Sequence, residues 1–210
     1  VTSFAWVTTL GLGPSVLSVH ASVPATSVKE LLAHGKANPG KLTLSTSGGY
    51  AQFCAELFHH MSGMKLVVVV YKGGFPALLD VMSGQAHLIL GSYVTSQTHV
   101  RSGKLVALGV TTAQRATALP DIPTIAESAV PGYEVSGWYG VVGPSGMPPA
   151  VIARLNKEIN ANLLILETRK QMANEGAEPR TATPEEFGAT MARDLQKWAR
   201  VVKEAGIKQQ

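Results

Sequence analysis

The sequence predicts an α/β protein with a largely parallel sheet, and two observations support this class. Short apolar segments with strand character alternate with helical segments, an order that is typical of βαβ units. Hydrophobic residues make up 45% of the 210 residues and charged residues 15%, which excludes a disordered chain and indicates a folded core. Glycine and proline are spread along the chain, as in a fold with many turns and no long linker.

The first elements follow from local patterns. Segments 4–7 and 16–21 are predicted to be extended. Ser27-Val-Lys-Glu30 is a capping box that opens a helix to about Lys36. A strand over 42–45 leads through a Gly48-Gly49 turn into a helix that ends near Met61. The β-branched run 67–70 predicts a strand that is covered on both faces.

The alternation continues in the second half of the chain. A helix follows the turn at Gly73-Gly74, and strands are predicted over 87–90, 105–110 and 135–142. The segment 113–133 is rich in Pro, Thr and Ala, which indicates a surface crossover. Helices then follow, and two of them carry apolar faces: Ile152, Leu155, Ile159 and Leu163 on the first, and Phe187, Met191, Leu195, Trp198 and Val202 on the last.

Composition and spacing exclude several classes of site. The net charge of +4 comes from scattered Lys and Arg, whereas nucleic-acid interfaces concentrate these residues on one surface. A single cysteine, Cys54, excludes an internal disulfide and a multi-cysteine metal site. The histidines lack metal-ligand spacing, and Ser62-Gly-Met-Lys65 lacks the partner motifs of penicillin-recognising enzymes. We therefore expect no enzyme, no metal or cofactor, and no nucleic-acid partner.

Gly/Ser-rich turns are the remaining candidate for a functional site. Thr46-Ser47-Gly48-Gly49 and Lys72-Gly73-Gly74 each precede a predicted helix, whose N-terminus favours a negative group. Gly91-Ser92 and Ser136-Gly-Trp138 lie at predicted strand ends or crossings, where ligands collect in open α/β sheets. The pattern indicates a binding protein for a small ligand, although ordinary βα turns would have the same composition.

Several segments carry a resemblance to a known family: 22–31, 38–41, 55–58, 71–74, 76–78, 83–85, 102–105, 118–127, 131–134, 176–179, 183–187 and 197–198. In these segments the chain resembles the Bug-type solute-binding receptors of tripartite tricarboxylate transporters. The resemblance implies a periplasmic protein with a type II periplasmic-binding-protein fold, in which two α/β lobes close on a small carboxylate. It also implies integral-membrane transporter subunits as partners. The complete lobe is expected over 14–132, and 1–13 with 133–210 would form the other lobe in part.

The resemblance also implies which residues bind the ligand. The loop from Ser45 to Tyr50 matches the clamp of the second lobe, Gly91-Ser92 the strand end beside the cleft, and 136–139 the returning hinge. The expected ligand-binding residues are Ser45, Ser47, Gly48, Gly49, Tyr50, Gly91, Ser92, Ser136 and Trp138.

The chain begins where the first lobe of such a receptor is already half built. We therefore expect an N-terminally truncated receptor whose solute capture is impaired. The alternative is an interaction or sensing module that self-associates and no longer captures solute. An uncovered sheet edge and open apolar helix faces favour pairing with another chain, so a homodimer is expected.

Overall fold

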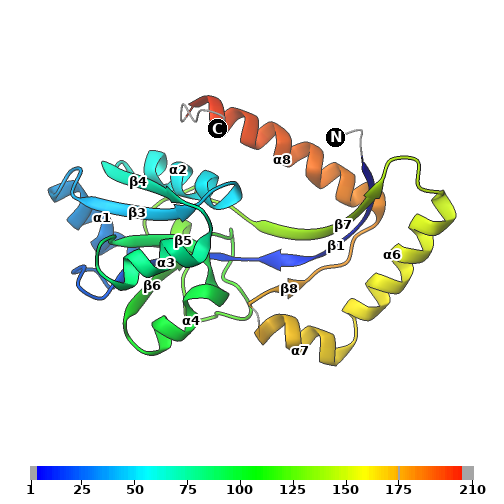
Figure 1. Cartoon of the computed structure of the whole chain (residues 1–210), viewed down its shortest axis with the longest axis horizontal. Coiled ribbons are helices and arrows are strands. Elements are labelled where there is room, and N and C mark those ends of the chain that lie inside the picture. The colour runs from blue at the N-terminus through cyan, green and yellow to red at the C-terminus, as the bar shows by residue number, and fades with distance from the viewer. Residues whose placement is uncertain (1–3, 175, 205–210) are drawn as a thin grey trace. The chain divides into compact units, whose positions relative to one another are not determined.

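A computed structural model describes residues 4–174 and 176–204 and divides them into two compact units (Figure 1). The first unit combines residues 4–13 with Gly137–Lys203, and the second is Pro14–Ser136. The chain thus leaves the first unit, builds the second and returns. Each unit has its own sheet.

The second unit is built on a five-stranded sheet in the order β4-β3-β5-β2-β6. Its strands are β2 (Ser15–His20), β3 (Leu42–Ser47), β4 (Leu66–Tyr71), β5 (Leu88–Ser92) and β6 (Leu105–Val110). β3 is parallel to β4 and β5, whereas β2 is antiparallel to β5 and β6. The α/β class is confirmed, but the expected largely parallel sheet is mixed. Successive parallel strands are joined by a crossover, usually a helix. No helix precedes β2, which runs antiparallel to both of its neighbours.

Helices connect these strands: α1 (Val28–Ala37), α2 (Tyr50–Ser62), α3 (Gly74–Met82), α4 (Tyr93–Arg101) and the short α5 (Ile125–Ser128). A buried cluster joins α3 to the sheet, with Leu78 and Val81 packing beside Ile89 of β5. The prediction that 67–70 is covered on both faces was wrong. β4 is one of the two edge strands of this sheet, and the side chains of Val67 and Val70 are 47% and 36% exposed.

The segment from 113 to 133 is also less superficial than its composition indicates. Ala116 and Leu119 pack against Val16 and Val110, and Tyr133 is fully buried. The Tyr133 hydroxyl donates to the carbonyl of Cys54 at 3.0 Å, and its ring meets Phe58 edge-on. The expected surface crossover therefore forms part of the core.

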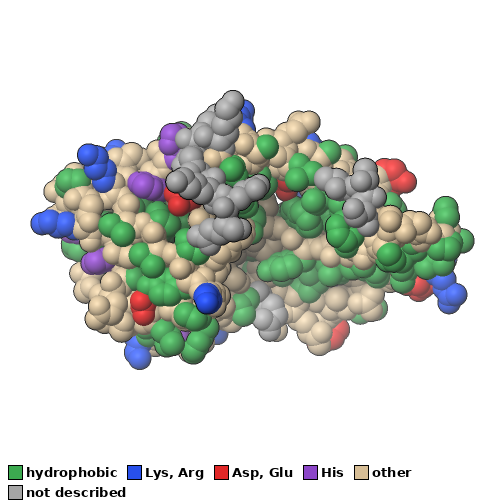
Figure 2. Space-filling model, turned by 45° about the horizontal axis from the view of Figure 1, so that its top comes forward, with side chains coloured by type: hydrophobic (Ala, Val, Ile, Leu, Met, Phe, Trp, Pro, Cys, Tyr) green, Lys and Arg blue, Asp and Glu red, His purple; other side chains and the backbone are tan. Residues whose placement is uncertain are grey.

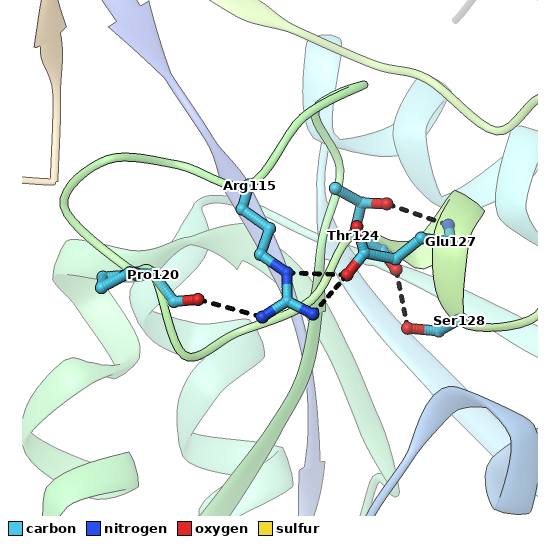
Figure 3. Close-up of polar contacts among 5 residues, drawn as sticks. All are labelled: Arg115, Pro120, Thr124, Glu127 and Ser128. Carbon is cyan, nitrogen blue, oxygen red and sulfur yellow. Dashed lines mark hydrogen bonds and ion pairs between the residues drawn. The ribbon is translucent and has the colours of Figure 1, made fainter.

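Arg115, Pro120 and Glu127 form a group of polar contacts in the exposed part of this segment, which we call the clasp (Figure 3). The Arg115 guanidinium donates to one carboxylate oxygen of Glu127, with N–O distances of 2.7 and 2.6 Å, and to the carbonyl of Pro120 at 3.1 Å. The Thr124 hydroxyl accepts from the Glu127 backbone N–H and caps α5. The carboxylate of Glu127 in α5 thus binds Arg115, which lies near the start of the segment.

The first unit contains a three-stranded antiparallel sheet in the order β7-β1-β8. The strands are β1 (Phe4–Gly13), β7 (Gly137–Pro144) and β8 (Glu178–Pro179), and the helices are α6 (Pro149–Leu163), α7 (Leu166–Asn174) and α8 (Pro184–Glu204). Phe187 of α8 lies between Trp6 and Trp138, with ring centroids 5.3 and 5.2 Å from its own. This aromatic cluster fixes α8 on the sheet.

Apolar burial differs strongly between the units. Within the described residues of the first unit, the buried apolar side chains are Val7, Leu163, Phe187 and Val201; the other buried apolar side chains lie in Pro14–Ser136. Large apolar side chains on the surface are more frequent in the first unit: Phe4, Tyr139, Val142, Val151, Leu155, Leu164, Ile165, Leu166 and Leu195. Figure 2 shows such side chains gathered in a band. The predicted apolar faces of α6 and α8 are therefore only partly covered.

Candidate functional site

The carboxyl ends of three parallel strands meet at one edge of the five-stranded sheet. Ser47, the last residue of β3, is paired with Tyr71, the last residue of β4. On the other side of β3, Ser45 is paired with Ile89, so β5 reaches the same edge with Gly91 and Ser92. A βα turn leaves each strand here, which brings the loop 48–50, the loop 72–73 and Ser92 together. This is where ligands bind in open α/β sheets.

Two further segments reach the same edge. Ser15 begins β2 and is paired with Ser92, and its backbone N–H donates to the Thr111 hydroxyl at 3.2 Å. The N–H of Val135 donates to the carbonyl of Thr111 at 2.8 Å, which places the neighbouring Ser136 at this edge. Three serines, Ser47, Ser92 and Ser136, therefore lie at this edge. The start of β2 and the residue that follows β6 lie beside them.

The helices that start at this edge begin without stabilising side chains of their own, as α6 of the first unit also does. The N-cap residues of α2, α3 and α4 are Gly49, Gly73 and Ser92; none makes a side-chain cap, and no acidic residue stands in the first turns. By contrast, α1, α5 and α8 each start with a Ser or Thr hydroxyl that accepts a hydrogen bond from the backbone N–H of a Glu in the first turn. A Glu in the first turn already stabilises the positive helix end. The helix starts at this edge keep that positive potential for an external anion.

The turn before α2 leaves space for a ligand. Gly49 has φ +67°, a conformation that favours glycine, and a Cβ placed there would meet no atom within 4 Å. At Gly48 a Cβ would have a single neighbour, a methyl of Val70 at 3.9 Å. Tyr50 follows with 37% of its side chain exposed. Gly48 and Gly49 are themselves exposed, so a ligand can approach this turn from outside.

The predicted ligand-binding residues separate into three groups. Ser47, Gly48, Gly49, Tyr50, Gly91, Ser92 and Ser136 lie at the edge just described and are half-buried or exposed. Ser45 lies lower in β3 and is fully buried. Trp138 belongs to the first unit, where its indole N–H donates to Asp194 at 2.6 Å and its ring packs on Phe187.

The ligand-binding residues expected from the sequence did not include Ser15, Lys72 and Thr111, which also lie at this edge, although Lys72 belongs to a turn that the sequence marked as a candidate. Lys72 is exposed in the turn between β4 and α3. The Thr111 hydroxyl accepts from the Ser15 N–H at 3.2 Å, and the Thr111 N–H donates to the Ser15 carbonyl at 2.9 Å. Each follows or begins a predicted strand, so the signal was present in the strand boundaries. Nearby, the Tyr71 hydroxyl donates to the carboxylate of Asp80, and this hydrogen bond raises the pKa of Tyr71.

A cavity of about 560 Å³ lies within the first unit. Its wall contains Trp6, Ile152 and Ala153 with the carboxylate of Glu185, a lining that does not suit an anion. No cluster of three or more His, Cys, Asp or Glu side chains suited to a metal occurs among the described residues. In the same residues, no helix has the length and apolar character to span a membrane.

Comparison with known proteins places these features in a family. The model of the tripartite tricarboxylate transporter family receptor matches residues 1–207. The protein BugT of Bordetella pertussis is 34% identical over 204 residues, which are 96% of this chain and 63% of BugT. This chain therefore spans less than two thirds of the length of that relative.

Solved structures agree with this comparison. A structure of R. palustris Rpa4515 with adipate has a TM-score of 0.90 and 33% identity, and the match covers 97% of this chain and 69% of that one. The structure of the periplasmic binding protein BugD has a TM-score of 0.86 and 30% identity, with 99% and 71% covered. The fold is thus that of these periplasmic binding proteins.

Proposed function

Because this chain belongs to the receptor family of tripartite tricarboxylate transporters, we propose that it is a periplasmic solute-binding receptor for a small carboxylate. The observation that carries the proposal is the edge at which α2, α3 and α4 begin without side-chain caps or acidic first turns. A carboxylate placed there would accept hydrogen bonds from backbone N–H groups at Gly48 and Gly49. The adipate in the similar R. palustris structure supports the same ligand class.

Each residue at the edge has a distinct role in this proposal. The hydroxyls of Ser47 and Ser92 donate to carboxylate oxygens, and Lys72 adds a positive charge at the mouth of the site. Ser136 lies beside them through the backbone link from Val135 to Thr111. Tyr50 limits the space next to the Gly48-Gly49 turn and so restricts the shape of the ligand. The proposed activity is capture and release, with no catalytic step.

The membrane-embedded subunits of the transporter are the proposed partners of the loaded receptor. Family membership supports this assignment and the periplasmic location. The proposal includes no nucleic acid, since Lys and Arg are scattered over the sequence.

A matched pair of glycine variants tests the site. Gly49→Leu places a side chain in the turn and should weaken binding of adipate at least tenfold, about 1.4 kcal/mol, by titration calorimetry. Gly40→Leu is the control, because Gly40 has φ +74°, open space around it and a position at the opposite end of β3. Both variants carry the same backbone strain, so their thermal stabilities should fall alike. Equal affinity in the two variants would place the anion site elsewhere.

A second candidate function is an interaction module that self-associates without capturing solute. The observation that favours it is the first unit, where large apolar side chains stay exposed over few buried ones. Thermal stabilisation by a panel of aliphatic and aromatic carboxylates separates the candidates, because a ligand that binds the folded state raises its melting temperature. A shift at micromolar ligand supports the receptor, and no shift with any carboxylate supports the module.

A further inference from the structure

The end of the five-stranded sheet that lies opposite the candidate site carries a row of basic side chains. β3, β4, β5 and β6 begin at this end, and β2 ends there. In the strand order β4-β3-β5-β2-β6, the residues at this end are Lys65, Lys41, His87, His20 and Lys104. Neighbouring strands lie about 4.8 Å apart, so the row is roughly 20 Å wide. Residues that are far apart in the sequence thus form one basic surface.

Backbone hydrogen bonds fix the spacing of this row. They join neighbouring strands at this end, with the N–H donor given first: Gly40 to Lys65 at 2.8 Å, His87 to Thr43 at 3.1 Å, His20 to His87 at 2.9 Å and Ala21 to Lys104 at 3.1 Å. The imidazole of His87 is held as well, because its Nδ1 accepts from the Thr43 N–H at 3.1 Å. The sheet therefore sets how far apart the lysines stand.

The lysines of the row have no structural partner for their charge. Lys41, Lys65 and Lys104, which we call the lysine row, are exposed and form no ion pair within the described residues. Each directly precedes a strand, whereas Lys36 and Arg101 stand in the last turns of α1 and α4 at the same end. Basic residues in a last turn offset the partial negative charge of the helix end. Helix stabilisation therefore explains Lys36 and Arg101 but not the lysine row.

Acidic side chains do not balance this charge. The segments 34–41, 59–65, 83–87 and 99–104, which form this end, contain no Asp or Glu. The acidic residues on α1, α2 and α3 each have a partner within the unit: Glu30 accepts from Thr26, Glu56 pairs with His59 at 3.8 Å, and Asp80 accepts from Tyr71. Figure 2 shows Lys, Arg and His side chains on the surface of this unit. Positive charge thus exceeds negative charge at this end.

This surface is formed by the second unit alone. The chain enters the unit at β2, whose first residue, Ser15, lies at the candidate-site edge, and it leaves at Ser136 of the same edge. The opposite end is therefore built within Pro14–Ser136. The lysine row does not depend on what adjoins the first unit.

The layout of the row indicates the kind of partner that it fits. Lys65 and Lys41 stand on neighbouring strands, but Lys104 stands three strands beyond Lys41, so no single small anion spans the row. The four segments named above contain no Phe, Tyr or Trp. Such residues anchor protein interfaces and stack on the bases of nucleic acids. Separated lysines without aromatic anchors fit a planar array of anionic lipid head groups.

We propose that the lysine row docks the second unit on an anionic lipid bilayer. The ammonium groups lie among the phosphate groups of the lipids, and no side chain enters the hydrocarbon. This docking goes beyond solute capture and uses no residue of the carboxylate site. It would hold the chain close to the membrane-embedded partners proposed above. Each lysine near such a surface changes the affinity about fivefold, so the three together contribute roughly a hundredfold.

Co-sedimentation with lipid vesicles tests the docking. The chain should sediment with vesicles of phosphatidylcholine and phosphatidylglycerol in a ratio of three to one, and it should stay in solution with phosphatidylcholine alone. Replacing the whole row by Lys41→Gln, Lys65→Gln and Lys104→Gln should lower partitioning onto the anionic vesicles roughly a hundredfold. Added salt should weaken binding of the parent chain, because it screens exposed charges.

A second triple variant, Arg154→Gln with Lys157→Gln and Lys170→Gln, is the matched control. These three residues are exposed in the first unit, so both triple variants lose the same charge. The control should bind the anionic vesicles about as well as the parent, and circular dichroism shows that both variants are folded. Equal losses in the two variants, or a parent chain that does not bind anionic vesicles at low salt, would overturn the proposal. Adipate titration reports separately on the carboxylate site, which lies at the other end of the sheet.

Discussion

Tyr133 shows how one side chain fixes a long connection to the core. The residue ends the crossover that follows β6, and its hydroxyl donates to the carbonyl of Cys54 in α2. Its ring packs edge-on against Phe58. Burial raises the pKa of Tyr133 well above the ordinary phenol value, and the nearby Cys54 thiol acts in the same direction. The phenol is therefore held neutral in the folded state.

Tyr133→Phe should lower the free energy of unfolding at neutral pH, and this loss should shrink at alkaline pH. At pH 7 the loss of one buried hydrogen bond should lower the free energy of unfolding by about 1 kcal/mol. Above the unfolded phenol pKa of about 10, the unfolded parent releases a proton that the folded parent keeps, so its stability falls as pH rises. The variant lacks this contribution. Urea unfolding from pH 7 to pH 11 should show the two curves converging.

Tyr139→Phe is the matched control at neutral pH, because the Tyr139 side chain is 56% exposed. Its free energy of unfolding at pH 7 should lie within about 0.5 kcal/mol of the parent. Parallel curves for the parent and Tyr133→Phe throughout the alkaline range would contradict the assigned role of the buried hydroxyl.

Among the elements, those with strong local patterns were predictable from the sequence. The capping box at Ser27 and Glu30 starts α1 as expected, and the Gly48-Gly49 turn leads into α2 as expected. Patterns within a strand, however, do not say which neighbours the strand has. β4 has the composition of a central strand yet lies at the edge, and β2 runs against β5 because of where the chain enters the sheet.

The clasp around Arg115 is a second feature that local patterns did not predict, because it joins residues that are twelve positions apart. Arg115→Ala should lower the free energy of unfolding by about 1 kcal/mol, since exposed ion pairs contribute little but a hydrogen bond to the carbonyl of Pro120 is also lost. Cleavage by a protease within 113–124 should become faster.

Arg154→Ala provides the comparison, because Arg154 is exposed on α6 in the other unit. That variant should leave both the stability and the cleavage pattern close to those of the parent. Unchanged cleavage in Arg115→Ala would show that packing of Leu119 and Ile125, rather than the clasp, holds the segment.

At the scale of the whole molecule, the candidate site depends on the order of the strands in the sheet, which local sequence patterns do not predict. Ser47 and Ser92 were predictable as strand ends, but their proximity requires β3 and β5 to be neighbours. Ser15 joins them because β2 is inserted next to β5. Trp138 was grouped with them by sequence position, whereas the structure gives its indole a carboxylate in the first unit.

The unequal cores predict that the two units unfold in separate steps. Each fully buried large apolar side chain contributes roughly 1.5–3 kcal/mol, and the first unit buries four apolar side chains within its described residues. All three tryptophans, Trp6, Trp138 and Trp198, lie in this unit, so their fluorescence reports on it. In guanidinium chloride the fluorescence midpoint should therefore lie below the midpoint of the far-UV circular dichroism signal.

Protein concentration gives this last prediction a second measurement. If copies of the chain associate through the exposed apolar side chains of the first unit, association stabilises this unit, and the fluorescence midpoint should rise with protein concentration. The later step of the circular dichroism curve should not move, because the five-stranded sheet of the second unit takes no part in this association. Coincident curves at every concentration would mean that the chain unfolds as one cooperative body in spite of its unequal cores.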